Sequence, residues 1–129
     1  RADKIKDDLL DFLIQQKREG KTVAAYGAAA KGSTILNYAG IKRDLLSFVC
    51  DKAKAKQGKF MPGSHLPILP PQWLWEARPD YVLILPRNIA AEVTEELREL
   101  AEQGTVFLTA VPDIQTPAPS RLKPPTVLK

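Results

Sequence analysis

The sequence predicts an α/β domain in which a parallel sheet of about five strands carries helices on both faces. Short apolar runs alternate along the chain with stretches whose apolar residues recur at helical spacing, and this alternation is typical of βαβ units. The run from Tyr81 to Leu85 has no polar alternation, so helices should cover both of its faces. A glycine, Gly27, follows the first apolar run, as at the strand-to-helix turn of such units.

The first half of the chain contains two predicted strands and two predicted helices. They are a helix over 3–19, a strand over 22–26, a short helix over about 33–39 and a strand over 46–50. The first helix has Ile5, Leu9, Phe12 and Leu13 on one face and ends at Gly20, a residue that commonly stops helices. Asp51 closes the second strand.

The second half of the chain repeats the alternation of strands and helices and then becomes rich in proline. The predicted elements are a short strand over 66–69, a helical turn opening at 70–71, a strand over 81–85, a helix over about 89–103 capped by Asn88, and a strand over 105–109. Five of the 11 prolines fall in the last 18 residues. We therefore expect a domain over 1–111 and a proline-rich tail over 112–129, either extended over the surface or disordered.

Composition excludes several classes of protein. Hydrophobic residues make up 44% of the 129 residues and charged residues 26%, which suits a soluble domain with its own core and not a collagen-like or disordered chain. No apolar run approaches the roughly 18 residues of a membrane span. A single cysteine, Cys50, excludes an internal disulfide and a multi-cysteine metal site, and it fits a cytoplasmic protein.

The start of the chain indicates a longer parent protein. The first residue is Arg1, the one methionine is Met61, and no signal-peptide pattern precedes the first helix. We therefore expect the chain to be a processed or excised piece.

The charge is concentrated in one segment. The net charge is +4 (19 basic minus 15 acidic residues), and Lys52, Lys54, Lys56 and Lys59 lie within eight residues that hold no acid. This lysine cluster is either a solvated loop or a rim that faces phosphate. Nucleic-acid binding is not expected, because no wide basic stripe with exposed aromatic residues accompanies the cluster.

The predicted topology places several polar residues at one edge of the sheet. Right-handed crossovers favour the strand order 3-2-1-4-5, as in Rossmann-like folds. In such sheets ligands bind at the carboxyl ends of the strands, where the strand order reverses. The loop from Gly27 to Ser33, Asp51 and the turn Pro86-Arg87-Asn88 all fall at that edge.

The loop from Gly27 to Ser33 has the parts of an anion site. Glycine allows a close approach, a helix N-terminus presents free N–H groups, and Lys31 adds charge. Asp51, 24 residues after Gly27, is spaced like the ribose-binding acid of dinucleotide folds. Yet Ala29 replaces the middle glycine of GxGxxG, and Ser33 stands where a P-loop needs lysine. The small residues could also serve only the packing of helix on strand.

Other chemically distinctive residues favour structural roles. His65 has no nucleophile beside it in the sequence, Cys50 ends a buried strand, and Trp73 and Trp75 suit packing. No cluster of His, Cys or carboxylates has metal-ligand spacing. The residues alone therefore predict a binding domain better than a complete enzyme.

Three segments resemble a known family. They are Val23 to Tyr38 (VAAYGAAAKGSTILNY), Gln57 to Ile68 (QGKFMPGSHLPI) and Arg78 to Pro86 (RPDYVLILP). The chain is similar, over roughly residues 5 to 112, to the C-terminal domain of the SAM-dependent sugar C-methyltransferases. The first two motifs are fairly specific, and the third alone is weak.

The resemblance implies a parent enzyme with a zinc-binding segment, a central SAM-binding domain and this Rossmann-like domain. Such an enzyme methylates a carbon of a nucleotide-linked deoxy-keto-sugar, as in deoxysugar biosynthesis. A base of the central domain removes a proton beside the ketone, and the enolate carbon takes the methyl group. The C-terminal domain helps to bind the nucleotide-diphosphate sugar, so SAM and the catalytic residues lie outside this chain, which alone should be inactive.

The family's motif positions carry over to named residues here. Tyr26, Gly27, Ala29, Lys31, Gly32, Asn37 and Tyr38 match the first motif, and Gly58, Pro62, Gly63 and His65 match the second. The resemblance implies that the loop amides and Lys31 face the diphosphate, while the second motif shapes the wall of the cleft. The candidate substrate site consists of Tyr26, Gly27, Ala29, Lys31, Gly32, Ser33, Asn37, Asp51, His65, Arg87 and Asn88.

One departure and two alternatives remain. The family often has an aromatic residue at the position of Arg87, and this arginine could itself meet phosphate. One alternative is a regulatory domain that binds NAD(P) or another nucleotide, which Asp51 favours and the missing glycine opposes. The other is a non-catalytic interaction module.

Overall fold

The computed structural model describes residues 2–28, 30–85 and 89–109. The predicted cap at Asn88 and the predicted tail over 112–129 lie outside these residues. Five strands form one parallel sheet in the order β3-β2-β1-β4-β5. They are β1 (Val23–Tyr26), β2 (Val49–Cys50), β3 (Ile68–Leu69), β4 (Tyr81–Ile84) and β5 (Val106–Thr109). The predicted strand number and order are confirmed.

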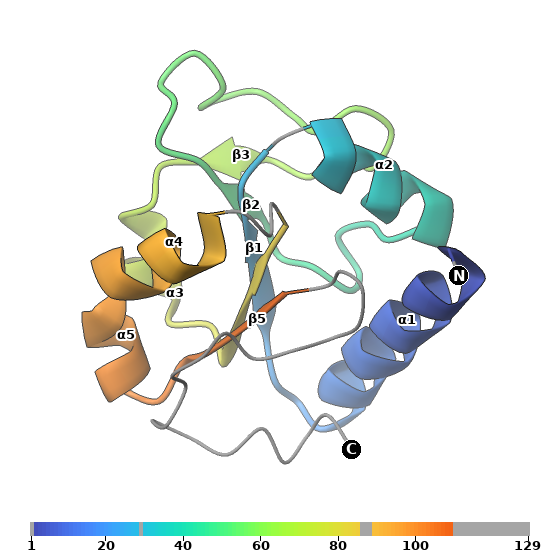
Figure 1. Ribbon diagram of the computed structural model, residues 1–129, viewed down its shortest axis with the longest axis horizontal. Helices are drawn as coiled ribbons and strands as arrows, with labels where there is room; N and C mark the ends of the chain where they lie inside the picture. Colours follow the sequence, from blue (N-terminus) through green and yellow to red (C-terminus); the bar gives the residue numbers. More distant parts are fainter. Residues whose placement is uncertain (1, 29, 86–88, 110–129) are drawn as a thin grey trace.

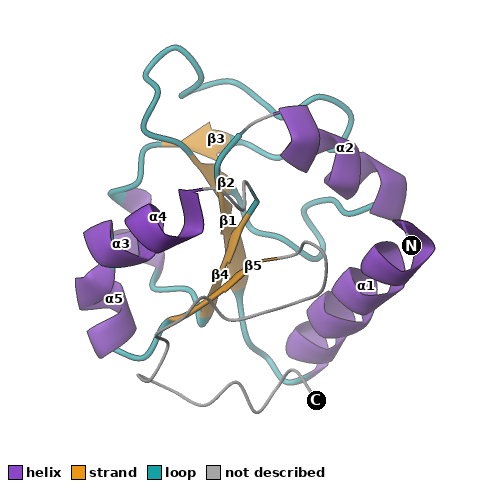
Figure 2. Cartoon of the chain, in the orientation of Figure 1, coloured by secondary structure: helices purple, strands orange, loops and turns teal. Residues whose placement is uncertain are grey.

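Helices cover both faces of the sheet (Figures 1 and 2). The helices α1 (Ala2–Arg18) and α2 (Ala30–Ala39) lie on one side, and α3 (Trp73–Ala77), α4 (Ala90–Glu96) and α5 (Arg98–Glu102) lie on the other. The domain therefore has the three-layer, Rossmann-like α/β architecture that the alternation of elements predicts.

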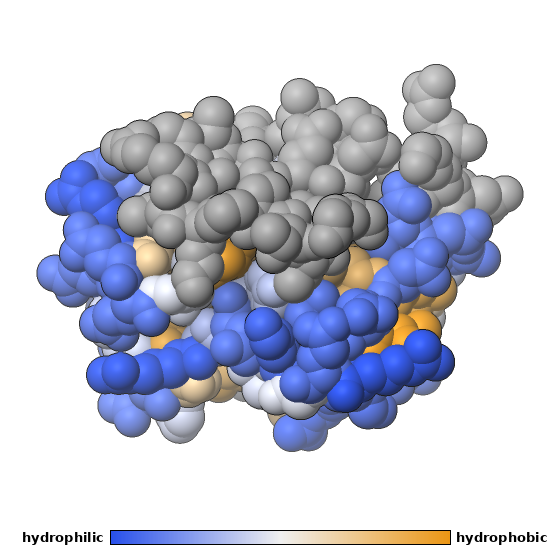
Figure 3. Space-filling model, turned by 90° about the horizontal axis from the view of Figure 1, so that it is seen from below, coloured by the Kyte–Doolittle hydropathy of each residue, from blue (hydrophilic) through white to orange (hydrophobic). Residues whose placement is uncertain are grey.

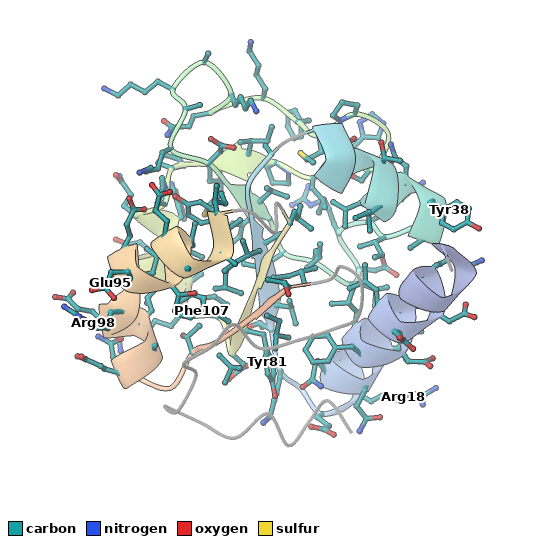
Figure 4. The ribbon with its side chains drawn as sticks, in the orientation of Figure 1. Arg18, Tyr38, Tyr81, Glu95, Arg98 and Phe107 are labelled. Atoms are coloured by element: carbon teal, nitrogen blue, oxygen red, sulfur yellow. The ribbon has the colours of Figure 1, made fainter. Side chains whose placement is uncertain are left out.

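Each face of the sheet has its own apolar core. Leu83 packs in the cluster that contains residues of α1 and α2, whereas Val82 and Ile84 pack in the cluster that contains residues of α3, α4 and α5. Successive residues of a strand point to opposite faces, so the unbroken apolar run of β4 supplies both cores. Tyr81, labelled in Figure 4, belongs to the first core and packs edge-on against Phe12 with ring centroids 5.1 Å apart.

Two predicted elements have wrong boundaries. The second helix begins at Ala30 and not near Ser33, because alanine and lysine favour helix and the turn at Gly27 is short. The single helix predicted over 89–103 is two helices that meet at Leu97. The Thr94 hydroxyl donates to the Ala90 carbonyl at 2.7 Å, and such a bond to the preceding turn often bends a helix.

Two strands, β2 and β3, are shorter than predicted. β2 covers two residues of the expected five, although the Ser47 amide still donates to the Val23 carbonyl and the Ala25 amide to the Phe48 carbonyl. β3 likewise covers two residues of the expected four. The pairing continues beyond the regular strand, so the predicted segments are correct and their regular parts are shorter.

In the face shown in Figure 3, hydrophilic residues predominate and apolar areas are small and separated. Within residues 2–28, 30–85 and 89–109, none of the helices combines the length and apolar character that crossing a bilayer requires.

Candidate functional site

The candidate site lies at the carboxyl ends of β1 and β2, at the edge of the sheet that is uppermost in Figure 1. The connection from β1 to α2 leaves the sheet here, and the long segment between β2 and β3 lies beside it. Because β1 stands between β2 and β4, this edge is also where the strand order reverses, the usual ligand position in open α/β sheets.

Gly27 makes the turn at the end of β1. Its φ of +99° is in the region that favours glycine, and its amide donates to the Cys50 carbonyl at 2.7 Å. The chain therefore turns sharply at the first residue after the strand. The next amide, that of Ala28, points toward β2 and reaches a side chain there.

That side chain is Asp51, and both of its carboxylate oxygens accept backbone hydrogen bonds. Oδ2 accepts from the Ala28 amide at 2.7 Å, and Oδ1 accepts from the Ala53 amide at 2.8 Å. Asp51 thus ties the β1–α2 connection to the turn that follows β2. The amide expected to bind an external anion is instead bonded to the protein's own carboxylate.

The turn over residues 51–57 is braced against the same connection. The Gln57 side-chain amide donates to the Asp51 carbonyl at 2.8 Å, and the Lys56 ammonium donates to the Ala28 carbonyl at 3.1 Å. Both the amide and the carbonyl of Ala28 are therefore held by this turn. The lysine cluster was recognisable in the sequence, but nothing in it indicated that Lys56 is the member at the β1–α2 connection.

The segment over residues 58–68 packs against α2. The Ser33 hydroxyl donates to the Pro62 carbonyl at 3.3 Å. Gly63, with φ +81°, lies so close to the Asn37 side chain that a Cβ at Gly63 would stand 2.7 Å from Asn37 Cγ. The two family motifs are therefore in contact, through Ser33 and Asn37 on one side and the 62–63 turn on the other.

His65 belongs to that turn and is exposed. Its φ is +61°, and its amide donates to the Met61 carbonyl at 3.0 Å. The left-handed backbone is uncommon for a histidine and closes the turn. Among the hydrogen bonds that the structure describes, none joins the His65 imidazole to Ser33 or Asn37.

Tyr26 lies below the site in the core and not on its surface. Its side chain is 3% exposed and packs in the core beneath α3 and α4. Its hydroxyl has no hydrogen-bond partner in the described structure. Burial raises the pKa of Tyr26 to about 12, and the nearby carboxylates Glu96 and Asp51 add to the shift. Cys50 is also core, as expected, and burial raises the pKa of its thiol to about 12.

An ion pair joins the turn that follows β2 to the end of α4. The Lys52 ammonium lies 2.7 Å from the Glu96 carboxylate, and this hydrogen bond raises the pKa of Lys52. Both side chains are exposed, so the pair adds little stability. The pair directs the Lys52 ammonium toward Glu96 at the end of α4.

The remaining candidates are placed in part or not at all. Lys31 and Gly32 fall in the first turn of α2, where backbone N–H groups lack partners within the helix. Ala29, Arg87 and Asn88 lie outside the described residues. Within the residues that the structure describes, no group of three or more His, Cys, Asp or Glu could hold a metal ion.

The parallel sheet in the order β3-β2-β1-β4-β5, with helices on both faces, defines a Rossmann-like α/β domain. A solved structure with the same fold is UDP-D-quinovosamine 4-dehydrogenase from Vibrio fischeri, with a TM-score of 0.53 and 21% identity over 72% of this chain and 79% of that one. At that identity the likeness concerns the fold.

Sequence comparison identifies the family. The model of the C-methyltransferase C-terminal domain matches residues 1–112, and the chain belongs to this family. It is 40% identical over 95 residues to the C-methyltransferase NovU of Streptomyces niveus. Those residues are 74% of this chain and 23% of NovU, so the chain corresponds to about a quarter of that relative.

Proposed function

We propose that this chain is the nucleotide-sugar-binding domain of a SAM-dependent C-methyltransferase whose substrate is a nucleotide-linked deoxy-keto-sugar. The observation that carries the proposal is the match of residues 1–112 to the C-methyltransferase C-terminal domain. Two features suit a diphosphate: the backbone N–H groups in the first turn of α2, and the Lys56 ammonium at the β1–α2 connection.

In this function the chain binds and orients, and the chemistry takes place elsewhere in the parent enzyme. Holding the sugar in one position lowers the entropic part of the barrier. The resemblance places the general base in the central domain, and Tyr26 is unsuited to that role because burial raises its pKa to about 12. Proton removal beside the sugar ketone is therefore assigned to another part of the parent enzyme.

Asp51 is the acid that the spacing offers for a ribose hydroxyl, and each of its carboxylate oxygens already accepts one backbone amide, which leaves fewer acceptor positions for a ribose. SAM supplies the methyl group when bound in the parent enzyme, and we assign its site outside this chain. The same engagement of Asp51 weighs against the alternative of an NAD(P)-binding regulatory domain.

The proposal is tested by titrating the chain with dTDP, dTDP-glucose, NAD and SAM while following backbone amide shifts by NMR. We expect the two dTDP compounds to shift residues 27–33 and the others to leave them unchanged. A response to NAD alone would favour the regulatory alternative, and no response to any of the four would favour an interaction module.

Lys31 provides a mutational test of the same proposal. Lys31→Ala should weaken binding of dTDP-glucose, since it removes a cation from the first turn of α2, and it should leave the unfolding midpoint unchanged. An unchanged dissociation constant would remove Lys31 from the site.

A further inference from the structure

The lysine cluster divides into members with different contacts. Lys52 is paired with Glu96 on α4 at 2.7 Å. Lys56 instead reaches the Ala28 carbonyl at 3.1 Å, so its ammonium lies at the β1–α2 connection. The sequence presents these lysines as equivalent, and the structure separates them by position.

The position of Lys56 is held by the turn to which it belongs. Asp51 accepts the Ala53 amide, and the Gln57 side chain donates to the Asp51 carbonyl. These two bonds fix the turn, and the bond from the Ala28 amide to Asp51 fixes the turn against the connection. The backbone from which Lys56 projects is therefore set before any ligand arrives.

The Lys56 ammonium keeps donors for a ligand. An ammonium carries three N–H groups, one hydrogen bond goes to the Ala28 carbonyl, and the side chain is exposed. A phosphate oxygen at the connection can accept the others, since lysine binds phosphate as a point charge.

Charge balance gives Lys56 a particular role. The Asp51 carboxylate places a negative charge against the Ala28 amide, where it repels an approaching diphosphate. Lys56 donates to the carbonyl of the same residue and so places a positive charge at the same connection. Lys52 is turned toward Glu96 and does not supply it.

We propose that Lys56 is a phosphate-binding residue of the nucleotide-sugar site, placed at the β1–α2 connection by the hydrogen bonds of Asp51 and Gln57. This role rests on the proposed function and adds to it a contact that the family resemblance does not assign. It predicts that the diphosphate is recognised jointly by the first turn of α2 and by the turn over residues 51–57.

The test measures the affinity of the whole chain for dTDP, dTDP-glucose and thymidine by isothermal titration calorimetry. Lys56→Ala should weaken binding of dTDP and dTDP-glucose about tenfold, which corresponds to ~1.4 kcal/mol, and should not change binding of thymidine, which has no phosphate. Lys56→Arg should retain most of the affinity. Lys54→Ala is the matched control, because it removes the same charge from the same exposed turn without a contact to Ala28.

The outcomes separate this inference from the function on which it rests. Binding of dTDP by the unmodified chain with no loss in Lys56→Ala would overturn the role of Lys56 and leave the proposed function standing. An equal loss in Lys54→Ala would also overturn it, because the effect would then be diffuse charge. Failure of the unmodified chain to bind any dTDP compound would overturn both.

Discussion

The contact between Gly63 and Asn37 joins the two family motifs, and substituting Gly63 by alanine tests how much it matters. Gly63 has φ +81°, and a Cβ there would lie 2.7 Å from both Cγ and Nδ2 of Asn37 and closer still to Oδ1. Gly58 has nearly the same backbone, with φ +83°, but no atom within 4 Å of the added Cβ. The two alanine variants therefore share the backbone strain and differ in the contact.

The expected magnitudes follow from this difference. Placing alanine in left-handed backbone costs about 1–2 kcal/mol at either position. Gly63→Ala must also displace Asn37, an exposed side chain at the surface of α2, and forcing a side chain off its rotamer costs about 0.5–1.5 kcal/mol. Gly63→Ala should thus lower the free energy of unfolding by ~0.5–1.5 kcal/mol more than Gly58→Ala.

Urea unfolding followed by tryptophan fluorescence measures both variants, since Trp73 and Trp75 both lie in the folded domain. Making both substitutions in an Asn37→Ala background removes the side-chain amide that Gly63→Ala would meet, so the difference between the two variants should vanish. The reasoning is refuted if Gly63→Ala costs no more than Gly58→Ala, or if the difference survives without Asn37.

Two further predictions concern groups beneath and beside the site. Asp51→Ala leaves the Ala28 and Ala53 amides without their acceptor. It should lower the free energy of unfolding by about 0.5–1.5 kcal/mol and speed hydrogen exchange at those two amides. Unchanged exchange would show that Asp51 does not hold them. Tyr26 and Cys50 have pKa values raised from 10.0 and 9.0 to about 12, so the folded protein holds both protons longer than the unfolded chain does. Their contribution to stability is complete below pH 9 and is lost as pH rises toward 12, and Tyr26→Phe should flatten the fall in unfolding midpoint above pH 10.

The sheet could be predicted from the sequence because its signals are local and repeated. The apolar run of β4 indicated that both faces are covered, and short connections with right-handed crossovers left few strand orders to consider. The break at Leu97 was not predictable from apolar spacing, since Leu97 and Leu100 are both buried and continue the same periodicity. The break follows the bond of Thr94 to Ala90, and a threonine within a helical pattern does not reveal which partner its hydroxyl takes.

The sequence predicted where in the sheet the candidate site lies, but it predicted few of the contacts between the residues there. The edge that holds Gly27 and Asp51 followed from topology. Which groups meet there depends on the 51–57 turn, and a turn of lysines and alanines has no periodicity that fixes its path. Lys56 was therefore noted in the sequence as one charge among four, and Tyr26 was assigned to a binding surface although its side chain is buried.

Asp51 illustrates why the spacing of a motif does not determine its function. An acid about 20 residues after the glycine turn binds a ribose when its oxygens are open, and the sequence of this chain satisfies that spacing. Here the carboxylate accepts the Ala28 and Ala53 amides, and the middle glycine that would allow a pyrophosphate to approach is Ala29. The alanine bears equally on NAD(P) and on a nucleotide-diphosphate sugar, because both ligands carry a diphosphate, so it does not distinguish between them. What the structure adds is the use of the acid: the contacts of Asp51 give it a structural role, in which it joins the β1–α2 connection to the turn over residues 51–57.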